Sequence, residues 1–178
     1  DEVRIWHSEQ QDRKAQMIIK ELNQKPEIKV RIAFASDLED IYELDVATFA
    51  MPWSKEALNY DILENDNAFV IVAECEGEFA GYADIWTVLD EADLNSIAVS
   101  TDLRRKGIGE ELIRAMLELL EDNGVMTINL EVRVSNIPAI ALYKKYGFKE
   151  CGVRPEYYLD NGEDALIMKR ETGDYAPE

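Results

Sequence analysis

Residues 94–134 read LNSIAVSTDLRRKGIGEELIRAMLELLEDNGVMTINLEVRV, and this stretch decides the fold. An apolar run leads into a loop with two glycines, then into apolar residues at helical spacing, and then into a run that alternates apolar and polar residues. Asn123 and Gly124 form a typical helix C-terminus between the last two parts. A strand, a helix and a strand in this order predict a parallel strand pair joined by a crossover helix.

The segments on either side of this unit predict further strands and helices. Hairpin turns and apolar alternation indicate strands, and Pro138 and Gly147 bound a helix after the unit. The expected order is β-α-α-β-β-β-α-β-α-β-β, a mixed α/β sheet with antiparallel edges and helices on both faces. The expected strands outside the unit are residues 28–34, 68–75, 79–88, 148–153 and 165–169, with helices at 36–49, 54–63 and 138–146 and a loop at 154–164.

These elements predict one folded domain with short extensions. The domain is expected at residues 28–171, and a chain of 178 residues is long enough to bury a sizeable core. Residues 1–27 are a polar leader with an expected helix around residues 12–22, and residues 172–178 are a short acidic tail.

The charge of the chain is strongly negative and uneven. Lys and Arg number 19 against 37 Asp and Glu, which gives a net charge of −18. Such a chain lacks the basic surface that binding to nucleic acid or to an anionic membrane requires, so we expect neither partner. Residues 34–103 hold seventeen acidic side chains and one basic one, Lys55, whereas three basic residues follow together at 104–106. This pattern predicts a local anion site beside a surface that attracts cations.

The composition also bounds the compartment and the metal chemistry. Cys75 and Cys151 each lie in an apolar strand segment, so both are expected to be buried free thiols in a reducing compartment, the cytoplasm. The single histidine, His7, and the absence of Cys-x-x-Cys spacing predict no metal site. The longest uncharged apolar run, residues 68–73, is too short to span a bilayer, and the charged first residues are unlike a signal peptide.

The first candidate site is the loop between the strand and the helix of the central unit. Its glycines, Gly107 and Gly109, allow the backbone to approach a ligand, and the helix that begins at Ile108 offers free N–H groups. Three cations stand beside them: Arg104, Arg105 and Lys106. Together these groups predict a cradle for a phosphate or diphosphate, although a flexible turn with solvated charges has the same composition.

Two further side chains could take part in proton transfer. Glu131 lies on the polar face of the second strand, with Asn129 and Arg133, and a polar face beside the basic loop indicates an open site in which Glu131 acts as a general base. An ordinary surface pair of Glu131 and Arg133 is the alternative. Tyr143 follows on the next helix as a candidate proton donor, since a phenol stays protonated at neutral pH, or as an aromatic residue packed on the sheet.

In this order, the three features resemble the GCN5-related N-acetyltransferase (GNAT) family. The Arg-x-x-Gly-x-Gly loop resembles the family's acetyl-CoA diphosphate loop, and the Glu-Val-Arg-x-Ser-Asn and Ala-Leu-Tyr segments at 131–136 and 141–143 are more specific. The resemblance extends over about residues 28–170. Within the family, the segments at 51–54, 97–99, 154–158 and 163–165 are most similar to enzymes that acetylate the N-terminal alanine of ribosomal proteins.

The resemblance implies a fold, a reaction and a set of site residues. It implies a mostly antiparallel sheet with a splayed parallel pair, and transfer of acetyl from acetyl-CoA to the α-amine of a protein N-terminus, without a metal. The acceptor would be a ribosomal protein with an N-terminal alanine, attracted by the acidic surface. Glu131 would be the general base, Tyr143 the general acid, and Tyr157 and Tyr158 would border the acceptor. The cofactor contacts would be Ile97, Ala98, Val99, Arg104, Arg105, Lys106, Gly107, Ile108, Gly109 and Asn136.

Two other functions remain compatible with the sequence. The acceptor amine could belong to a lysine side chain or a polyamine, because an acidic surface attracts any cation. The chain could also be a non-catalytic acetyl-CoA-binding module that uses its acidic surface or its leader to bind a partner protein.

Overall fold

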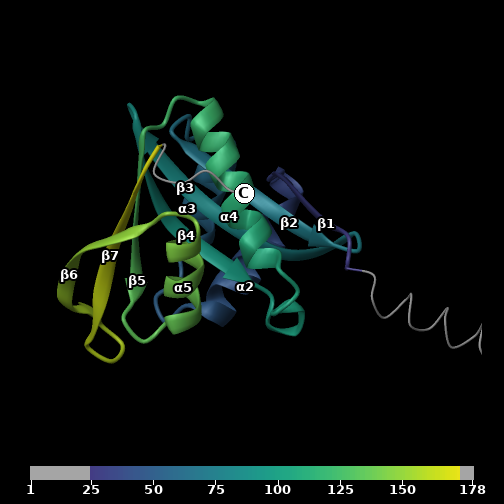
Figure 1. Ribbon diagram of the computed structural model, residues 1–178. Helices are drawn as coiled ribbons and strands as arrows, with labels where there is room; N and C mark the ends of the chain where they lie inside the picture. The colour runs from purple at the N-terminus through teal and green to yellow at the C-terminus, as the bar shows by residue number, and fades with distance from the viewer. Residues whose placement is uncertain (1–24, 173–178) are drawn as a thin grey trace, which may run out of the picture.

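One sheet of seven strands forms the centre of the described molecule, in the order β1-β2-β3-β4-β5-β7-β6 (Figure 1). The computed structural model describes residues 25–172, so the predicted leader helix and nearly all of the predicted tail lie outside the described residues. The strands are β1 (Ile28–Ile32), β2 (Ala68–Cys75), β3 (Glu78–Val88), β4 (Glu91–Val99), β5 (Thr127–Arg133), β6 (Lys149–Tyr158) and β7 (Glu163–Glu171). The α-helices are α2 (Leu38–Thr48), α3 (Lys55–Leu63), α4 (Ile108–Asp122) and α5 (Ile137–Lys145).

The predicted order of elements and the predicted parallel pair are confirmed. β4 and β5 pair in parallel across the α4 crossover, and every other pairing of neighbouring strands in the sheet is antiparallel. The loop that starts α4 and the turn that ends it also match the sequence, since Gly107 and Gly124 have left-handed φ angles of 85° and 77°. Glycine adopts these angles at no steric cost.

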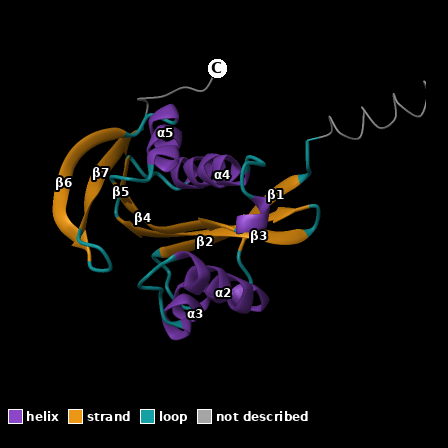
Figure 2. Cartoon of the chain, turned by 90° about the horizontal axis from the view of Figure 1, so that it is seen from below, coloured by secondary structure: helices purple, strands orange, loops and turns teal. Residues whose placement is uncertain are grey.

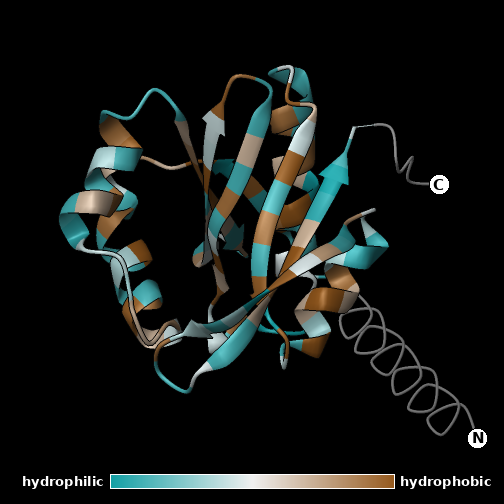
Figure 3. Ribbon diagram, turned by 90° about the vertical axis from the view of Figure 1, so that its left-hand side faces the viewer, coloured by the Kyte–Doolittle hydropathy of each residue, from teal (hydrophilic) through white to brown (hydrophobic). Residues whose placement is uncertain are grey.

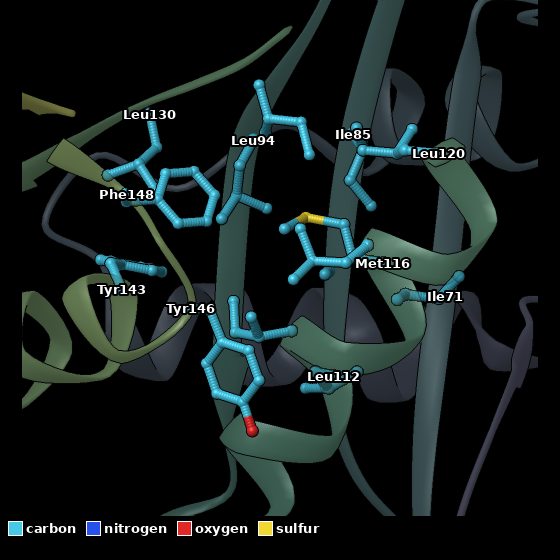
Figure 4. Packing of buried hydrophobic residues seen from close by; sticks show 14 of the residues in the cluster. Ile71, Ile85, Leu94, Leu112, Met116, Leu120, Leu130, Tyr143, Tyr146 and Phe148 are labelled. Atoms are coloured by element: carbon cyan, nitrogen blue, oxygen red, sulfur yellow. The ribbon is translucent and has the colours of Figure 1, made fainter. Parts of the chain in front are cut away.

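Helices cover both faces of the sheet (Figure 2). We call these the α4/α5 face and the α2/α3 face. Figure 3, in which the ribbon is coloured by hydropathy, shows apolar and polar residues alternating along the strands. On the α4/α5 face, the side chains of α4 that repeat at helical spacing pack on β1, β2, β3 and β4, and Figure 4 shows part of this core. Members of this core that are less than 5% exposed include Ile85, Leu112, Met116, Leu120, Leu130 and Phe148.

The parallel pair opens after four residues. β4 and β5 are in register from Glu91 with Thr127 to Leu94 with Leu130 and then separate. Asn95 is the extra residue of a β-bulge in β4, because Asp84 of β3 pairs with Ser96 and the next residue, Ile85, pairs with Leu94. The two diverging segments, residues 95–99 of β4 and 131–133 of β5, are called the fork below. The splayed strand pair is thus confirmed, and Glu131 is the first residue of its β5 arm.

Two expectations for the C-terminal hairpin are wrong. The expected loop at residues 154–164 is mostly strand, because β6 continues to Tyr158 through an irregular pairing between Arg154 and Tyr158. Proline and two charged residues in this stretch hide the strand pattern from sequence reasoning. Cys75 is buried as expected, but Cys151 is exposed. β6 is the edge strand of the sheet and most of its residues are exposed, so an apolar residue there need not be buried.

Candidate active site

The β4 arm of the fork presents backbone groups to the space beside it. The Ser100 N–H donates to the Ala80 carbonyl at 2.8 Å, so Ser100 turns toward β3. Because successive residues of a strand point their backbone groups in opposite directions, Ala98 also turns toward β3, whereas Ile97 and Val99 turn into the fork. Of the three predicted residues, Ile97 and Val99 therefore offer backbone hydrogen bonds there, and the Ala98 side chain is buried against the α2/α3 face.

The predicted anion loop lies at the end of this arm. Arg104, Arg105 and Lys106 are exposed, and the side chain of Ile108 is buried beneath them. Arg105 has a left-handed φ of 66°, which is uncommon for a residue other than glycine and shows that the loop is held in a defined shape. α4 begins at Ile108 with no side-chain cap, so its first N–H groups are available to an anion. A Cβ atom at Gly109 would lie 3.8 Å from the Val99 side chain, an ordinary van der Waals contact, so the space between β4 and the helix would also admit alanine there.

Glu131 projects from the β5 arm and is held by two side chains of β6. Arg154 donates from Nε to the Glu131 carboxylate at 2.7 Å, and the Glu131 side chain is 27% exposed. Tyr157 is hydrogen-bonded to the same carboxylate, which raises the pKa of Tyr157. The site therefore contains Arg154, to which sequence reasoning gave no role. Its position beside the two predicted tyrosines was the available signal.

Arg133 organises the turn that carries the second tyrosine. Its guanidinium lies over the Tyr158 ring, 3.9 Å from the ring centre, and donates to Asp160 at 2.9 Å and to Glu163 at 3.3 Å. Glu163 also accepts from the Ser135 N–H at 2.8 Å, and its bonds with Ser135 lower its pKa to about 2. The rings of Tyr157 and Tyr158 meet edge to face at 5.1 Å. These contacts fix both tyrosines beside Glu131.

Tyr143 approaches the fork from the other face of the sheet. It lies on α5, is 6% exposed, and packs edge to face on Phe148 with 5.6 Å between ring centres. Burial raises its pKa, so the phenol is protonated at neutral pH. Tyr158 contributes to the same shift, and the pKa of Tyr158 also responds to Glu131. Tyr158 therefore interacts electrostatically with both residues, and the joint role predicted for Glu131 and Tyr143 stays a prediction.

Asn136 takes a position at the start of α5. Its side-chain oxygen accepts a hydrogen bond of 3.3 Å from the Ala139 N–H and caps the helix, and the residue is exposed. The cap fixes the direction in which α5, and with it Tyr143, leaves β5. The role predicted for Asn136 in cofactor binding stays a prediction.

Sequence reasoning missed a set of buried carboxylates on the α2/α3 face. Asp45, Asp61 and Asp84 are 0%, 7% and 1% exposed. Tyr82 donates to Asp45 and is 2.6 Å from the Ser96 hydroxyl, next to the bulge of β4. Burial and a hydrogen bond with Asp61 raise the pKa of Asp84 to about 8. The signal in the sequence was a charged residue, Asp84, in the middle of an otherwise apolar strand.

Other possible sites in the described region have no part in this arrangement. An apolar cavity of about 400 Å³ lies along α5 but is not lined by Tyr143 or by any residue of the fork. No group of three His, Cys, Asp or Glu side chains within residues 25–172 is arranged to hold a metal ion. In the same part of the chain, no helix is both long and apolar enough to cross a membrane.

Comparisons with known proteins identify relatives over most of the chain. Residues 38–148 match the Acetyltransferase (GNAT) family. A Bacillus subtilis (strain 168) protein, provisionally named ribosomal protein bS18-alanine N-acetyltransferase, is 42% identical over 144 residues, which are 81% of this chain and 95% of the relative. The Escherichia coli (strain K12) ribosomal protein bS18-alanine N-acetyltransferase is 38% identical over 144 residues, 75% of this chain and 90% of the relative.

The crystal structure of the E. coli ribosomal-protein-alanine N-acetyltransferase has the same fold. It superposes with a TM-score of 0.76 at 35% identity, covering 85% of this chain and 97% of that one. The resemblance seen in the sequence is thereby confirmed, including its similarity to the ribosomal-protein-alanine acetyltransferases, the RimI enzymes. The chain belongs to the GCN5-related N-acetyltransferase family and is an N-acetyltransferase.

Proposed function

We propose that the protein transfers acetyl from acetyl-CoA to the α-amine of a protein N-terminus, with the N-terminal alanine of a ribosomal protein, bS18, as the acceptor. The observation that carries the proposal is the fork, with Glu131 on the α2/α3 face and Tyr143 on the other. The curated relatives named for this acceptor support it. A ribosomal acceptor would meet the enzyme in the cytoplasm, the compartment that the sequence predicts.

The features around the fork fit acetyl-CoA as the substrate. Ile97 and Val99 turn their backbone groups into the fork. The amide groups of the pantetheine part of acetyl-CoA can hydrogen-bond to these groups, as a neighbouring β-strand would. The exposed cations at 104–106 and the uncapped start of α4 can bind the diphosphate at the end of the pantetheine chain. This assignment leaves the acetyl group inside the fork, between Glu131 and Tyr143.

The two faces then supply the two proton transfers. A protein α-amine has a pKa of about 7.7 to 8.0 and arrives largely as ammonium, so a base must remove a proton before the nitrogen can attack. Glu131 accepts this proton, directly or through a water molecule. The amine nitrogen bonds to the thioester carbon, the carbon–sulfur bond breaks, and the departing thiolate takes a proton from the Tyr143 hydroxyl. The surplus proton that the nitrogen still carries after the attack is lost through water and restores the Tyr143 hydroxyl. A lysine amine, with a pKa of about 10.4, is a more demanding acceptor for a carboxylate base.

A comparison of acceptors tests the proposal. The enzyme is incubated with acetyl-CoA and each of three acceptors: a peptide with a free N-terminal alanine, the same peptide with a formylated α-amine and an internal lysine, and spermidine. Mass spectrometry should detect acetylation of the free α-amine, at least ten times faster than of the other two. Faster acetylation of the internal lysine or of spermidine would overturn the proposal in favour of side-chain or polyamine acetylation.

A further inference from the structure

Two tryptophans lie half-exposed on the α2/α3 face, apart from the residues assigned to acetyl transfer. Trp53, in the loop between α2 and α3, is 38% exposed, and Trp86, near the end of β3, is 40% exposed. Their ring centres are 6.0 Å apart with an angle of 49° between the planes. Large aromatic side chains that remain accessible as a pair often mark a binding surface.

Two of the buried carboxylates hold this pair in place. Asp45 accepts from the Trp53 backbone N–H at 2.7 Å, and Asp61 accepts from the Trp86 indole N–H at 2.8 Å. Both carboxylates are nearly inaccessible to solvent, so each tryptophan is tied to the interior of the molecule. A surface of this kind loses little conformational entropy when it binds a ligand.

The strand register connects the pair to Glu131. Trp86 is the partner of Asp93 in β4, and Asp93 is the partner of Asn129 in β5, so the three side chains share one face of the sheet. Glu131 follows two residues after Asn129 on the same face. Two strand spacings and two residues of rise give about 12 Å between the Cα atoms of Trp86 and Glu131. An extended peptide covers that distance in about three to four residues.

The charge around the pair selects for a cation. Asp93 is exposed beside Trp86, and residues 34–103, which include both tryptophans, carry seventeen acidic side chains against one basic one. Within residues 25–172, the rings covered by a Lys or Arg are Phe34, Tyr42, Tyr146 and Tyr158, so the chain itself places no cation over either tryptophan. Tryptophan faces bind cations better than other aromatic rings do.

We propose that Trp53, Trp86 and Asp93 form a subsite for a positively charged side chain, arginine or lysine, at the second to fourth residue of the acceptor. The proposal rests on the proposed function, because the acceptor must begin at Glu131. The indole faces take the flat side of the cation, and Asp93 neutralises its charge. The subsite adds selectivity for the residues next to the acetylated N-terminal one, which Glu131 cannot supply.

Isosteric peptides measure this selectivity. Peptides with N-terminal alanine carry one arginine at position 2, 3 or 4, or citrulline, its uncharged isostere, at the same position. At low ionic strength, we expect kcat/KM for one arginine peptide to exceed that for its citrulline counterpart by about tenfold, in the range that a cation–π contact and an exposed ion pair together supply. Equal values at all three positions would overturn the proposal.

Matched variants assign the selectivity to the subsite. Asp93→Asn should lower the preference for arginine about threefold, whereas Asp122→Asn, the same change at the far end of α4, should leave it unchanged. Trp86→Leu should lower it, whereas Trp86→Phe should keep most of it, since both lose the bond to Asp61 and only phenylalanine keeps an aromatic face. A preference that survives Asp93→Asn and Trp86→Leu would also overturn the proposal.

Binding separates this proposal from the proposed function. The same peptides are titrated calorimetrically into the enzyme saturated with CoA, which cannot transfer acetyl. Acetylation of the same peptides is measured separately with acetyl-CoA. If the arginine peptide binds preferentially but is not acetylated in that assay, the result would support the subsite and contradict the proposed function. Acetylation of both peptides at equal rates, with equal binding, would support the function and contradict the subsite. Failure of both peptides to bind would contradict both.

Discussion

The two faces of the sheet bury different chemistry. The α4/α5 face buries a largely apolar core, in which α4 packs on β1 to β4, together with one charged side chain, Arg170. The α2/α3 face buries Asp45, Asp61, Asp84 and Ser96 beside a smaller apolar cluster. An apolar core tolerates the exchange of one apolar side chain for another of similar volume, and its packing does not depend on pH. A buried carboxylate, in contrast, requires specific hydrogen-bond partners. The first face therefore provides stability, and the second provides the fixed polar positions around the acceptor side of the fork.

The largest effect is expected in the fork, at Glu131 on the α2/α3 face. Glu131→Gln keeps the shape of the side chain but removes the base, so we expect kcat/KM for an N-terminal alanine peptide to fall about 10² to 10⁴-fold. Acetyl-CoA affinity, measured by calorimetry, should stay within about twofold, because a general base adds little to ground-state binding. Glu118→Gln, on the exposed side of α4, is the control and should retain full activity. Unchanged turnover of Glu131→Gln across the pH range would remove Glu131 from the mechanism.

Truncation of the apolar core tests the α4/α5 face. Met116→Ala removes a side chain that is 0% exposed, so we expect the free energy of unfolding to fall by about 2 to 5 kcal/mol, equally at pH 6 and pH 9. Met51→Ala makes the same change where the side chain is 70% exposed, and should cost less than about 0.5 kcal/mol. Chemical denaturation measures both. A loss at Met116 that varies with pH would contradict the assignment of this face to apolar packing.

A carboxylate on the other face should make stability depend on pH. Burial raises the pKa of Asp84 to about 8, above its value near 3.9 in the unfolded chain. Between these values the folded state binds more protons than the unfolded state, so this group lowers stability as pH rises from about 4 to 8 and adds no further change above 8. Asp84→Asn keeps a neutral partner for Asp61. At pH 8 its free energy of unfolding should exceed that of the wild type by on the order of 2 to 4 kcal/mol. The two proteins should be alike at pH 4.5. A gain that is the same at both pH values would contradict the ionisation.

The same contrast explains which features the sequence predicts and which it does not. The periodicity of α4 and the alternation along β5 follow from apolar burial, so the order of elements, the parallel pair and the position of Glu131 are all predictable from residues 94–134. The bulge at Asn95 and the partners of Asp45 depend on contacts between segments far apart in the chain, and no local pattern encodes them. The strand character of residues 154–158 is likewise hidden, because an edge strand need not alternate.

Arg154 shows the same limit within the candidate site. The sequence places it eleven residues after Tyr143, but its bond to Glu131 arises because β6 returns beside β7, which pairs with β5. The roles of Glu131, Tyr143 and the loop at 104–109 come from a family resemblance and not from spacing alone. The structure adds that Glu131 and Tyr143 lie on opposite faces of the sheet.

The smallest effect is expected at the anion loop, where exposed charges act through solvent. Lys106→Gln should raise KM for acetyl-CoA about threefold, because an exposed cation contributes little and the N–H groups at the start of α4 remain. The increase should shrink at high salt, since screening weakens the wild-type interaction first. S-acetylpantetheine, which lacks the diphosphate, separates this role from a general loss of activity: Lys106→Gln should leave its KM unchanged. Lys29→Gln makes the same change on the edge strand β1, away from the loop. It is the matched control and should behave as wild type with both substrates. An equal rise in KM for both thioesters would contradict the assignment. It would mean that the basic loop affects the shape of the fork and that the diphosphate binds elsewhere on the α4/α5 face.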